Sequence, residues 1–239
     1  MKIVRSNIFE RYSELLFGMS TRSGAALDMN MSFNVGDDPL HVAENRKKFF
    51  SALGIDGDRV AFPLQEHTSV VQVCTVPAQH PHCDALVTNA KNTFLAVSIA
   101  DCTPVMLYDP KKKVVAGIHA GWRGTSTKIV ENAVRLMRDQ YEVDPANIIA
   151  FIGPSAGGCC YEVGKEVAEL FPPECTTEKG SGKFFLDVKK ANRLQLLANG
   201  VQESHIEVHP DCSIHNQLYH SYRRDGTNSG RMLAIIGIE

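Results

Sequence analysis

Short runs of apolar residues, separated by polar turn residues, recur along much of the chain. Six of them have the length and composition of β-strands: Val60–Leu64, Val70–Val73, Ala85–Thr88, Leu95–Ile99, Val105–Tyr108 and Val114–His119. Asp101-Cys102 and Asp109-Pro110 separate the last three runs and mark turns. The apolar segments Ile148–Ile152 and Met232–Ile238 predict two more strands, the second of them buried at the end of the chain.

A different pattern begins at the acidic pair Asp37-Asp38, which Pro39 follows. An aspartate side chain accepts hydrogen bonds from the first turn of a helix, and proline suits the first helical position. The sequence HVAENRKKFFSAL comes next and ends at Gly54, a residue that adopts the left-handed conformation found at helix ends. A helix is therefore predicted from Pro39 up to Gly54.

Three further segments are predicted helices. Apolar side chains within Thr125–Gln140 recur at helical spacing and share one face. Val163–Phe171 and Lys189–Asn199 are the other two, and Gly200 closes the second. Helices and strands are thus interleaved, but strands also follow one another directly. This order favours mixed β-sheets covered by helices over a regular βαβ winding.

The composition is that of an ordinary globular protein. The chain has 239 residues, of which 44% are hydrophobic and 22% charged, close to the usual values. Its net charge of -2 lacks the basic excess typical of proteins that bind nucleic acids or anionic membranes. We therefore expect neither as a partner. No repeat or linker-like run divides the chain, so one domain over residues 1–239 is expected.

The amino-terminal sequence and the number of cysteines both favour a cytoplasmic location. Arg5, Glu10, Arg11 and Glu14 interrupt the segment in which a signal peptide would have its apolar region. No run approaches the ~20 apolar residues of a membrane span. Seven cysteines, an odd number without an export signal, predict reduced thiols rather than a disulfide framework.

The segment Val114–Thr127, VVAGIHAGWRGTST, is the richest in candidate chemistry. An apolar strand leads to His119, and glycines flank Trp122-Arg123 before a helix begins. Backbone N–H groups at such a turn favour an anion, and a guanidinium suits phosphate or carboxylate. A tight turn whose glycines serve packing alone is the alternative. The segment is not a Walker loop, because that spacing and its Gly-Lys-Ser/Thr ending are absent.

Cys102 and His67 are further candidates. Cys102 follows an aspartate between two apolar strands, where a thiol acts as a ligand, a nucleophile or a buried structural group. His67 lies between two predicted strands. Together with His119 they would suit zinc or copper and leave a fourth position for water or substrate. The intervals of 35 and 17 residues match no compact metal motif, so spacing alone leaves the three roles open.

Two segments nearer the carboxyl end contain the remaining notable cysteines. Cys159 and Cys160 follow a glycine-rich loop that would line a pocket or form a tight turn. Cys212 precedes Tyr219–Gly226, where two arginines beside aromatic residues would bind an aromatic or anionic ligand, or close a solvated turn. The roles of these three cysteines stay open.

Several motifs taken together resemble one family. Gln65 with His67, the sequence ADCTP at 100–104 and the sequence HAGWRG at 119–124 are similar to the motif set of the YfiH-like, laccase-domain proteins. These proteins are also described as multicopper polyphenol oxidases, purine nucleoside phosphorylases and peptidoglycan editing factors. Matching residues elsewhere are Asn30, Gly36-Asp37, Glu44-Asn45-Arg46, Gly153-Pro154, Tyr161-Glu162-Val163, Ala191-Asn192-Arg193, Leu196 and Ser221-Tyr222-Arg223-Arg224. One departure is Gln65-Glu66-His67-Thr68, where the family usually has Gln-Val-His-Gly.

The resemblance implies an α+β fold, layered α/β/β/α with mixed β-sheets. It implies catalysis at a zinc or copper ion held by His67, Cys102 and His119. It also implies phosphorolysis of adenosine, inosine and methylthioadenosine, with deamination of adenosine, so that purine nucleosides and phosphate are the expected partners. The residues expected to bind substrate are Asn30, Arg46, Gln65, Asp101, Arg123 and Arg223.

Three other functions remain open. Copper at the same site would oxidise phenols, although six further histidines show no ligand pattern for a multi-copper chain: His80, His82, His205, His209, His215 and His220. Cys102 would instead act as a thiolate nucleophile, with His119 as its base, in a hydrolase or peptidoglycan editing factor. A ligand-binding module without catalysis is the third.

Overall fold

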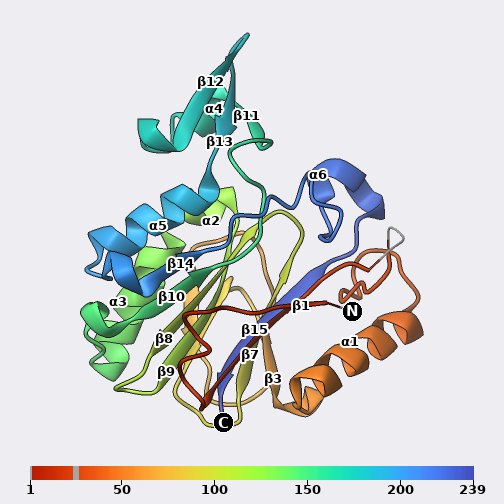
Figure 1. Ribbon diagram of the computed structural model, residues 1–239, viewed down its shortest axis with the longest axis vertical. Helices are drawn as coiled ribbons and strands as arrows, with labels where there is room; N and C mark the ends of the chain where they lie inside the picture. The colour runs from red at the N-terminus through yellow and green to blue at the C-terminus, as the bar shows by residue number, and fades with distance from the viewer. Residues whose placement is uncertain (1, 24–26) are drawn as a thin grey trace.

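The computed structural model describes residues 2–23 and 27–239, in which two mixed β-sheets pack face to face (Figure 1). The first six-stranded sheet runs β1 (Ile3–Val4), β2 (Leu15–Ser20), β15 (Met232–Ile238), β7 (Phe94–Ile99), β3 (Val60–Pro63) and β5 (Gln79–His80). The second runs β14 (Ile206–Val208), β10 (Ile149–Ile152), β8 (Thr103–Asp109), β9 (Val114–Ala120), β6 (Ala85–Thr88) and β4 (Val71–Val73).

A small antiparallel sheet stands at one end of the molecule, at the top of Figure 1. Its strands are ordered β11 (Glu162–Gly164), β13 (Lys183–Leu186) and β12 (Thr176–Gly180). The α-helices of the described residues are α1 (Pro39–Leu53), α2 (Trp122–Ser126), α3 (Ile129–Tyr141), α4 (Lys165–Ala168), α5 (Val188–Ala198) and α6 (Tyr222–Asp225). None of them is long and apolar enough to cross a membrane.

The buried side chains form a core in each of three interfaces between layers. One core fills the space between the two large sheets and includes Leu95 of β7 and Phe151 of β10. A second joins the outer face of the second sheet to α3 and α5. A third joins the first sheet to α1, through Phe49 and Ile235. The α+β fold with α/β/β/α layers and mixed sheets is therefore confirmed.

Several predicted elements agree closely with the structure. Asp38 caps α1 by accepting a hydrogen bond from the backbone of Leu40, and Gly54 ends the helix at φ +76°. The terminal strand β15 has the predicted bounds, and all seven of its residues are buried. The eight predicted strands each have a counterpart, with ends shifted by two residues or fewer.

Two predicted helices were wrong in part. The helix expected over Thr125–Gln140 is two helices, because Lys128 adopts φ +68° between α2 and α3. The helix expected over Val163–Phe171 is helical only in α4. Val163 instead belongs to β11 and pairs with Phe184 of β13, a partner that lies far along the chain and overrides the local preference.

Candidate metal centre

His67, Cys102 and His119 come from three separate parts of the chain and meet at one end of the two large sheets. Their possible ligand atoms all lie within 4.8 Å of one another. The two imidazole rings cross edge to face, with centroids 4.9 Å apart. The structure thus brings together the three residues that the resemblance singled out.

Strand pairing explains how Cys102 reaches His119. β8 and β9 are antiparallel, with Pro104 opposite His119, so the turn before β8 lies beside the end of β9. Asp101 adopts φ +83° in that turn. Side chains alternate along β9: Val114 and Ala116 pack toward the helices, and Val115 packs between the sheets. His119 shares the face of Val115 and therefore points between the sheets, toward Cys102.

A buried aspartate, Asp84, organises the other half of the centre. One carboxylate oxygen, Oδ1, accepts from the backbone N–H of His67 at 2.9 Å and contacts Nδ1 of His119 at 2.8 Å. The other, Oδ2, accepts from the backbone of Glu66 and from both the backbone and hydroxyl of Thr68. His67 adopts φ +62°, and these bonds hold its turn in that conformation. Asp84 was not among the predicted site residues, because its local signal is only an acidic residue directly before an apolar strand.

The charges of these groups support one another. Burial alone would raise the pKa of the Cys102 thiol, but His119 and His67 lower that pKa to about 6. Burial would lower the pKa of His119, whereas Cys102 and Asp84 raise it to about 9. Burial would raise the pKa of Asp84, but its hydrogen bonds bring that pKa to about 2. The centre therefore favours a thiolate on Cys102 beside a protonated imidazole on His119.

Two glycines of α2 and its cap allow the segments to approach one another. A Cβ atom on Gly121 would lie 3.0 Å from Sγ of Cys102 and 3.2 Å from a ring carbon of His67. A Cβ atom on Gly124 would lie 2.6 Å from the backbone oxygen of Thr68. Both glycines therefore serve packing, because a side chain at either position would collide with the neighbouring segment.

The donor set fits zinc or copper. Two imidazoles and one thiolate are ligands that both ions accept, and three protein ligands leave a further position open. Nδ1 of His119 contacts the carboxylate of Asp84, so Nε2 is the ring nitrogen that would bind an ion. Such a partner on the second ring nitrogen is typical of metal-binding histidines. His67 is exposed and Cys102 half-buried, which gives a small molecule access from solvent.

Asp101 and Arg223 lie beside this centre. Oδ2 of Asp101 accepts from the backbone N–H of Arg223 at 2.6 Å, and Oδ1 accepts from the Ser213 hydroxyl at 2.6 Å. The guanidinium of Arg223 lies 4.9 Å from the ring centroid of Tyr161 and donates to the backbone oxygen of Glu162. The exposed Arg223 and the half-buried Tyr161 thus form a platform at the edge of the centre.

Arg123 is exposed on α2, two residues after Gly121, and its guanidinium lies 4.3 Å from the Trp122 ring. The guanidinium therefore faces solvent, close to the turn that follows His119. The predicted role in phosphate binding stays a prediction.

The remaining residues expected to bind substrate have structural partners. The amide of Gln65 donates to and accepts from the backbone of Ser98, at 2.7 Å in both cases. Asn30 is buried and accepts from the backbone of Arg231. Arg46 donates to the backbone oxygen of Met31 and lies over two phenylalanine rings. These contacts hold each side chain in place, and direct contact with substrate stays a prediction for all three.

Comparisons with known proteins identify the family of the chain. A family model described as "Multi-copper polyphenol oxidoreductase laccase" matches residues 16–239. Purine nucleoside phosphorylase YlmD of Geobacillus stearothermophilus is 37% identical over 243 residues, covering 92% of this chain and 89% of that protein. A purine nucleoside phosphorylase of Deinococcus radiodurans is 39% identical over 227 residues, covering 92% and 85%. The crystal structure of YlmD from Geobacillus stearothermophilus superimposes with a TM-score of 0.94 and 33% identity, covering 100% of this chain and 97% of that one.

Proposed function

The chain belongs to the multi-copper polyphenol oxidoreductase laccase family, the YfiH-like laccase-domain proteins, and from this premise we propose that it is a metal-dependent purine nucleoside phosphorylase. The proposed substrates are adenosine, inosine and methylthioadenosine together with phosphate, and adenosine is also deaminated. The proposal includes one catalytic domain over residues 1–239, a cytoplasmic location and no nucleic-acid or membrane partner.

The observation that carries the proposal is the convergence of His67, Cys102 and His119 beside the guanidinium of Arg223 and the ring of Tyr161. Relatives that cover nearly the whole chain are named purine nucleoside phosphorylases. When bound, a zinc or copper ion would supply a Lewis acid that lowers the pKa of water toward ~7, the activation that deamination needs.

The chain's own residues would bind and orient the reactants. Phosphorolysis forms a bond between a phosphate oxygen and C1′ of the ribose and breaks the bond from C1′ to the base. The reaction develops positive charge on the sugar, which phosphate placed against it would stabilise. Arg123, exposed next to the Gly121 turn, is the proposed phosphate-binding residue. Arg223 and Tyr161 offer a planar surface suited to a purine.

A second candidate function rests on the contact between His119 and Asp84. Cys102, His119 and Asp84 stand in the order nucleophile, base and orienting carboxylate, with 2.8 Å between the last two. This geometry would serve a thiolate that attacks a carbonyl or amidine carbon without a metal. A copper-dependent oxidation of phenols is the other alternative, since the same three ligands accept copper.

The test is turnover by the metal-loaded protein and its Cys102→Ala variant. Inosine with phosphate should yield hypoxanthine. Its release should fall by about 100-fold or more in the variant, because changes even to the partners of metal ligands cost 10–100-fold. Cys175→Ala is the matched control, since Cys175 is buried outside the centre and should leave the rate within about two-fold of wild type. Equal activity of Cys102→Ala and wild type would exclude the centre as the site of catalysis.

Chelation distinguishes the alternatives. Metal removal should abolish deamination of adenosine and should slow phosphorolysis, as Cys102→Ala does. Phosphorolysis that survives metal removal would show that this reaction depends on the positioning of phosphate and not on the metal. Full activity of both kinds in metal-free protein would favour the Cys102 nucleophile. Phenol oxidation with copper, without turnover of any purine nucleoside, would favour the oxidase.

A further inference from the structure

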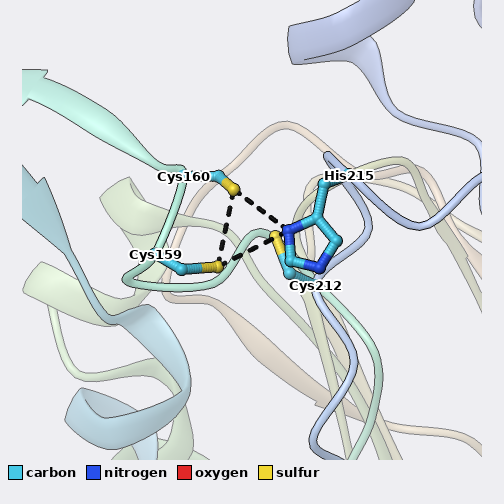
Figure 2. Close-up of side chains that lie close together, drawn as sticks. All are labelled: Cys159, Cys160, Cys212 and His215. Carbon is cyan, nitrogen blue, oxygen red and sulfur yellow. Dashed lines mark hydrogen bonds between the residues drawn. The ribbon is translucent and has the colours of Figure 1, made fainter.

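A second cluster of metal-binding side chains lies outside the candidate centre. Figure 2 shows the side chains of Cys159, Cys160, Cys212 and His215 pointing toward one another. The first two belong to the loop between β10 and β11, and the other two to the segment between β14 and α6. The sequence alone did not connect them, because more than fifty residues separate the pairs.

Their spacing is close to that of a tetrahedral metal site. Sγ of Cys160 lies 3.4 Å from Sγ of Cys159 and 3.2 Å from Nδ1 of His215, and Sγ of Cys159 lies 3.8 Å from that nitrogen. All four possible ligand atoms lie within 4.8 Å of one another. Around a zinc ion with the usual bond lengths, neighbouring ligand atoms would be about 3.5–3.8 Å apart. Small adjustments of the exposed Cys159 and His215 side chains toward the less exposed Cys160 and Cys212 would close the site.

The backbone holds the two loops together without a metal. Ser155 and Cys212 form a parallel β-bridge, and the backbone N–H of Ser213 donates to Ser155 at 2.9 Å. The buried Lys189 ammonium of α5 also donates to the backbone oxygens of His209 and Asp211, which holds the segment just before Cys212 in place. The ligands on the two loops are therefore kept close in advance.

Cys212 is placed as a thiolate ligand. Its sulfur accepts from the backbone N–H of Gly157 at 3.2 Å. Burial alone would raise its pKa, but backbone N–H groups of Gly157, Ile214 and His215 lower it below the ordinary value. By contrast, burial and the neighbouring thiols raise the pKa of Cys160 to about 12. Crowded sulfurs repel one another as thiolates, and a cation among them would remove that cost.

We propose that Cys159, Cys160, Cys212 and His215 bind a zinc ion in a closed, four-coordinate structural site, distinct from the centre at His67, Cys102 and His119. Three cysteines and one histidine are a standard ligand set of structural zinc. Binding displaces up to three protons, one from each thiol that is protonated beforehand. The ion would join the loop of Ser155 to that of Ser213, and both loops hydrogen-bond to Asp101. This proposal does not depend on the proposed function.

A disulfide is the principal rival for these thiols. The 3.4 Å between the sulfurs of Cys159 and Cys160 is well beyond a bond of about 2.05 Å, and all seven cysteines are free. A histidine nitrogen within 3.2 Å of Cys160 adds a donor that a disulfide would not need.

Zinc content tests the proposal. Reduced apoprotein should be loaded with Zn²⁺, freed of excess ion by gel filtration and analysed for metal. Wild type should retain about two ions per chain, and Cys102→Ala, Cys159→Ser and His215→Ala about one each. Cys159 and His215 are exposed, so these substitutions leave the buried core intact. Cys175→Ala, the matched control, should retain about two. Two ions in Cys159→Ser and in His215→Ala, or one ion in wild type that only Cys102→Ala loses, would overturn the proposal.

Cobalt distinguishes the two sites by their sulfur content. The proposed site contributes three thiolates and the candidate centre one, so Cys102→Ala loaded with Co²⁺ should keep about three quarters of the thiolate-to-cobalt charge-transfer absorption. The absorption that remains in Cys102→Ala should have the visible bands of tetrahedral Co²⁺, and adding His215→Ala should weaken those bands. Absorption that disappears entirely in Cys102→Ala would refute the second site, as would a Cys159–Cys160 or Cys160–Cys212 disulfide that persists in zinc-loaded protein.

Discussion

Asp84→Asn is the substitution that tests how the candidate centre is built. The change keeps the shape of the side chain but replaces one carboxylate oxygen with an amide nitrogen, which cannot accept a hydrogen bond. If the amide takes the place of Oδ1, it faces the donor on His67 and Nδ1 of His119. If it takes the place of Oδ2, it faces the backbone donors of Glu66 and Thr68. Either orientation loses at least two hydrogen bonds.

The size of the effect follows from those losses. A buried donor left without its acceptor costs about 1–3 kcal/mol, so the loss of two such bonds should lower the free energy of unfolding by about 2–6 kcal/mol. The affinity of the centre for zinc should fall by about 10–100-fold, because His119 loses the partner that orients its ring. Urea unfolding measures the first quantity, and competition with a chromophoric chelator measures the second.

Asp109→Asn is the matched control. Asp109 is as fully buried as Asp84, but its Oδ2 has no hydrogen-bond partner among the described residues, while Oδ1 accepts from the backbone of Lys111 and Lys112. An amide in place of Oδ2 should cost about 1 kcal/mol or less and leave zinc affinity unchanged. If Asp84→Asn matched this control in both measurements, the assignment of Asp84 as the organising residue would be wrong.

Two other predictions concern phosphate and acid stability. Arg123→Ala should raise the KM for phosphate by about 10-fold or more, because it removes a charged hydrogen bond, and should change the KM for inosine little. Arg138→Ala, at another exposed arginine, is the control. Equal KM values for phosphate in the two variants would contradict the assignment of Arg123 to phosphate binding. The pKa of His220 is lowered to about 4 by burial and by Arg22 and Arg231. The unfolded chain, with a histidine pKa near 6.5, binds this proton first, so stability is full above pH 6.5 and falls as the pH drops toward 4. Between pH 7 and 5 this residue should lower the free energy of unfolding by about 2 kcal/mol. Urea unfolding of His220→Gln should no longer show that loss. The same dependence of unfolding free energy on pH in wild type and His220→Gln would contradict the role of His220.

Local signals predicted the elements that depend on local interactions. The capping residues Asp38 and Gly54 mark both ends of α1 because the hydrogen bonds and the left-handed turn involve neighbouring residues. β15 is apolar on both faces because one face packs against the second large sheet and the other against α1. Val163, by contrast, forms a strand only because Phe184 pairs with it, and no neighbouring residue carries that information.

The same distinction applies to the candidate centre. The intervals between His67, Cys102 and His119 contain no metal motif, and the resemblance to the family was what grouped them. Sheet pairing brings the three together, through the register that sets Pro104 opposite His119. The roles of Asp84 and His215 were not predicted, because their partners are distant in sequence and close only in the fold.

The products formed from inosine test the central claim most directly. Metal-loaded protein incubated with inosine and phosphate should form hypoxanthine and ribose 1-phosphate in equal amounts, with one phosphate consumed for each, and hypoxanthine release should depend on phosphate. Hypoxanthine released together with free ribose, without consumption of phosphate, would contradict phosphorolysis, as would the absence of any turnover of inosine, adenosine or methylthioadenosine.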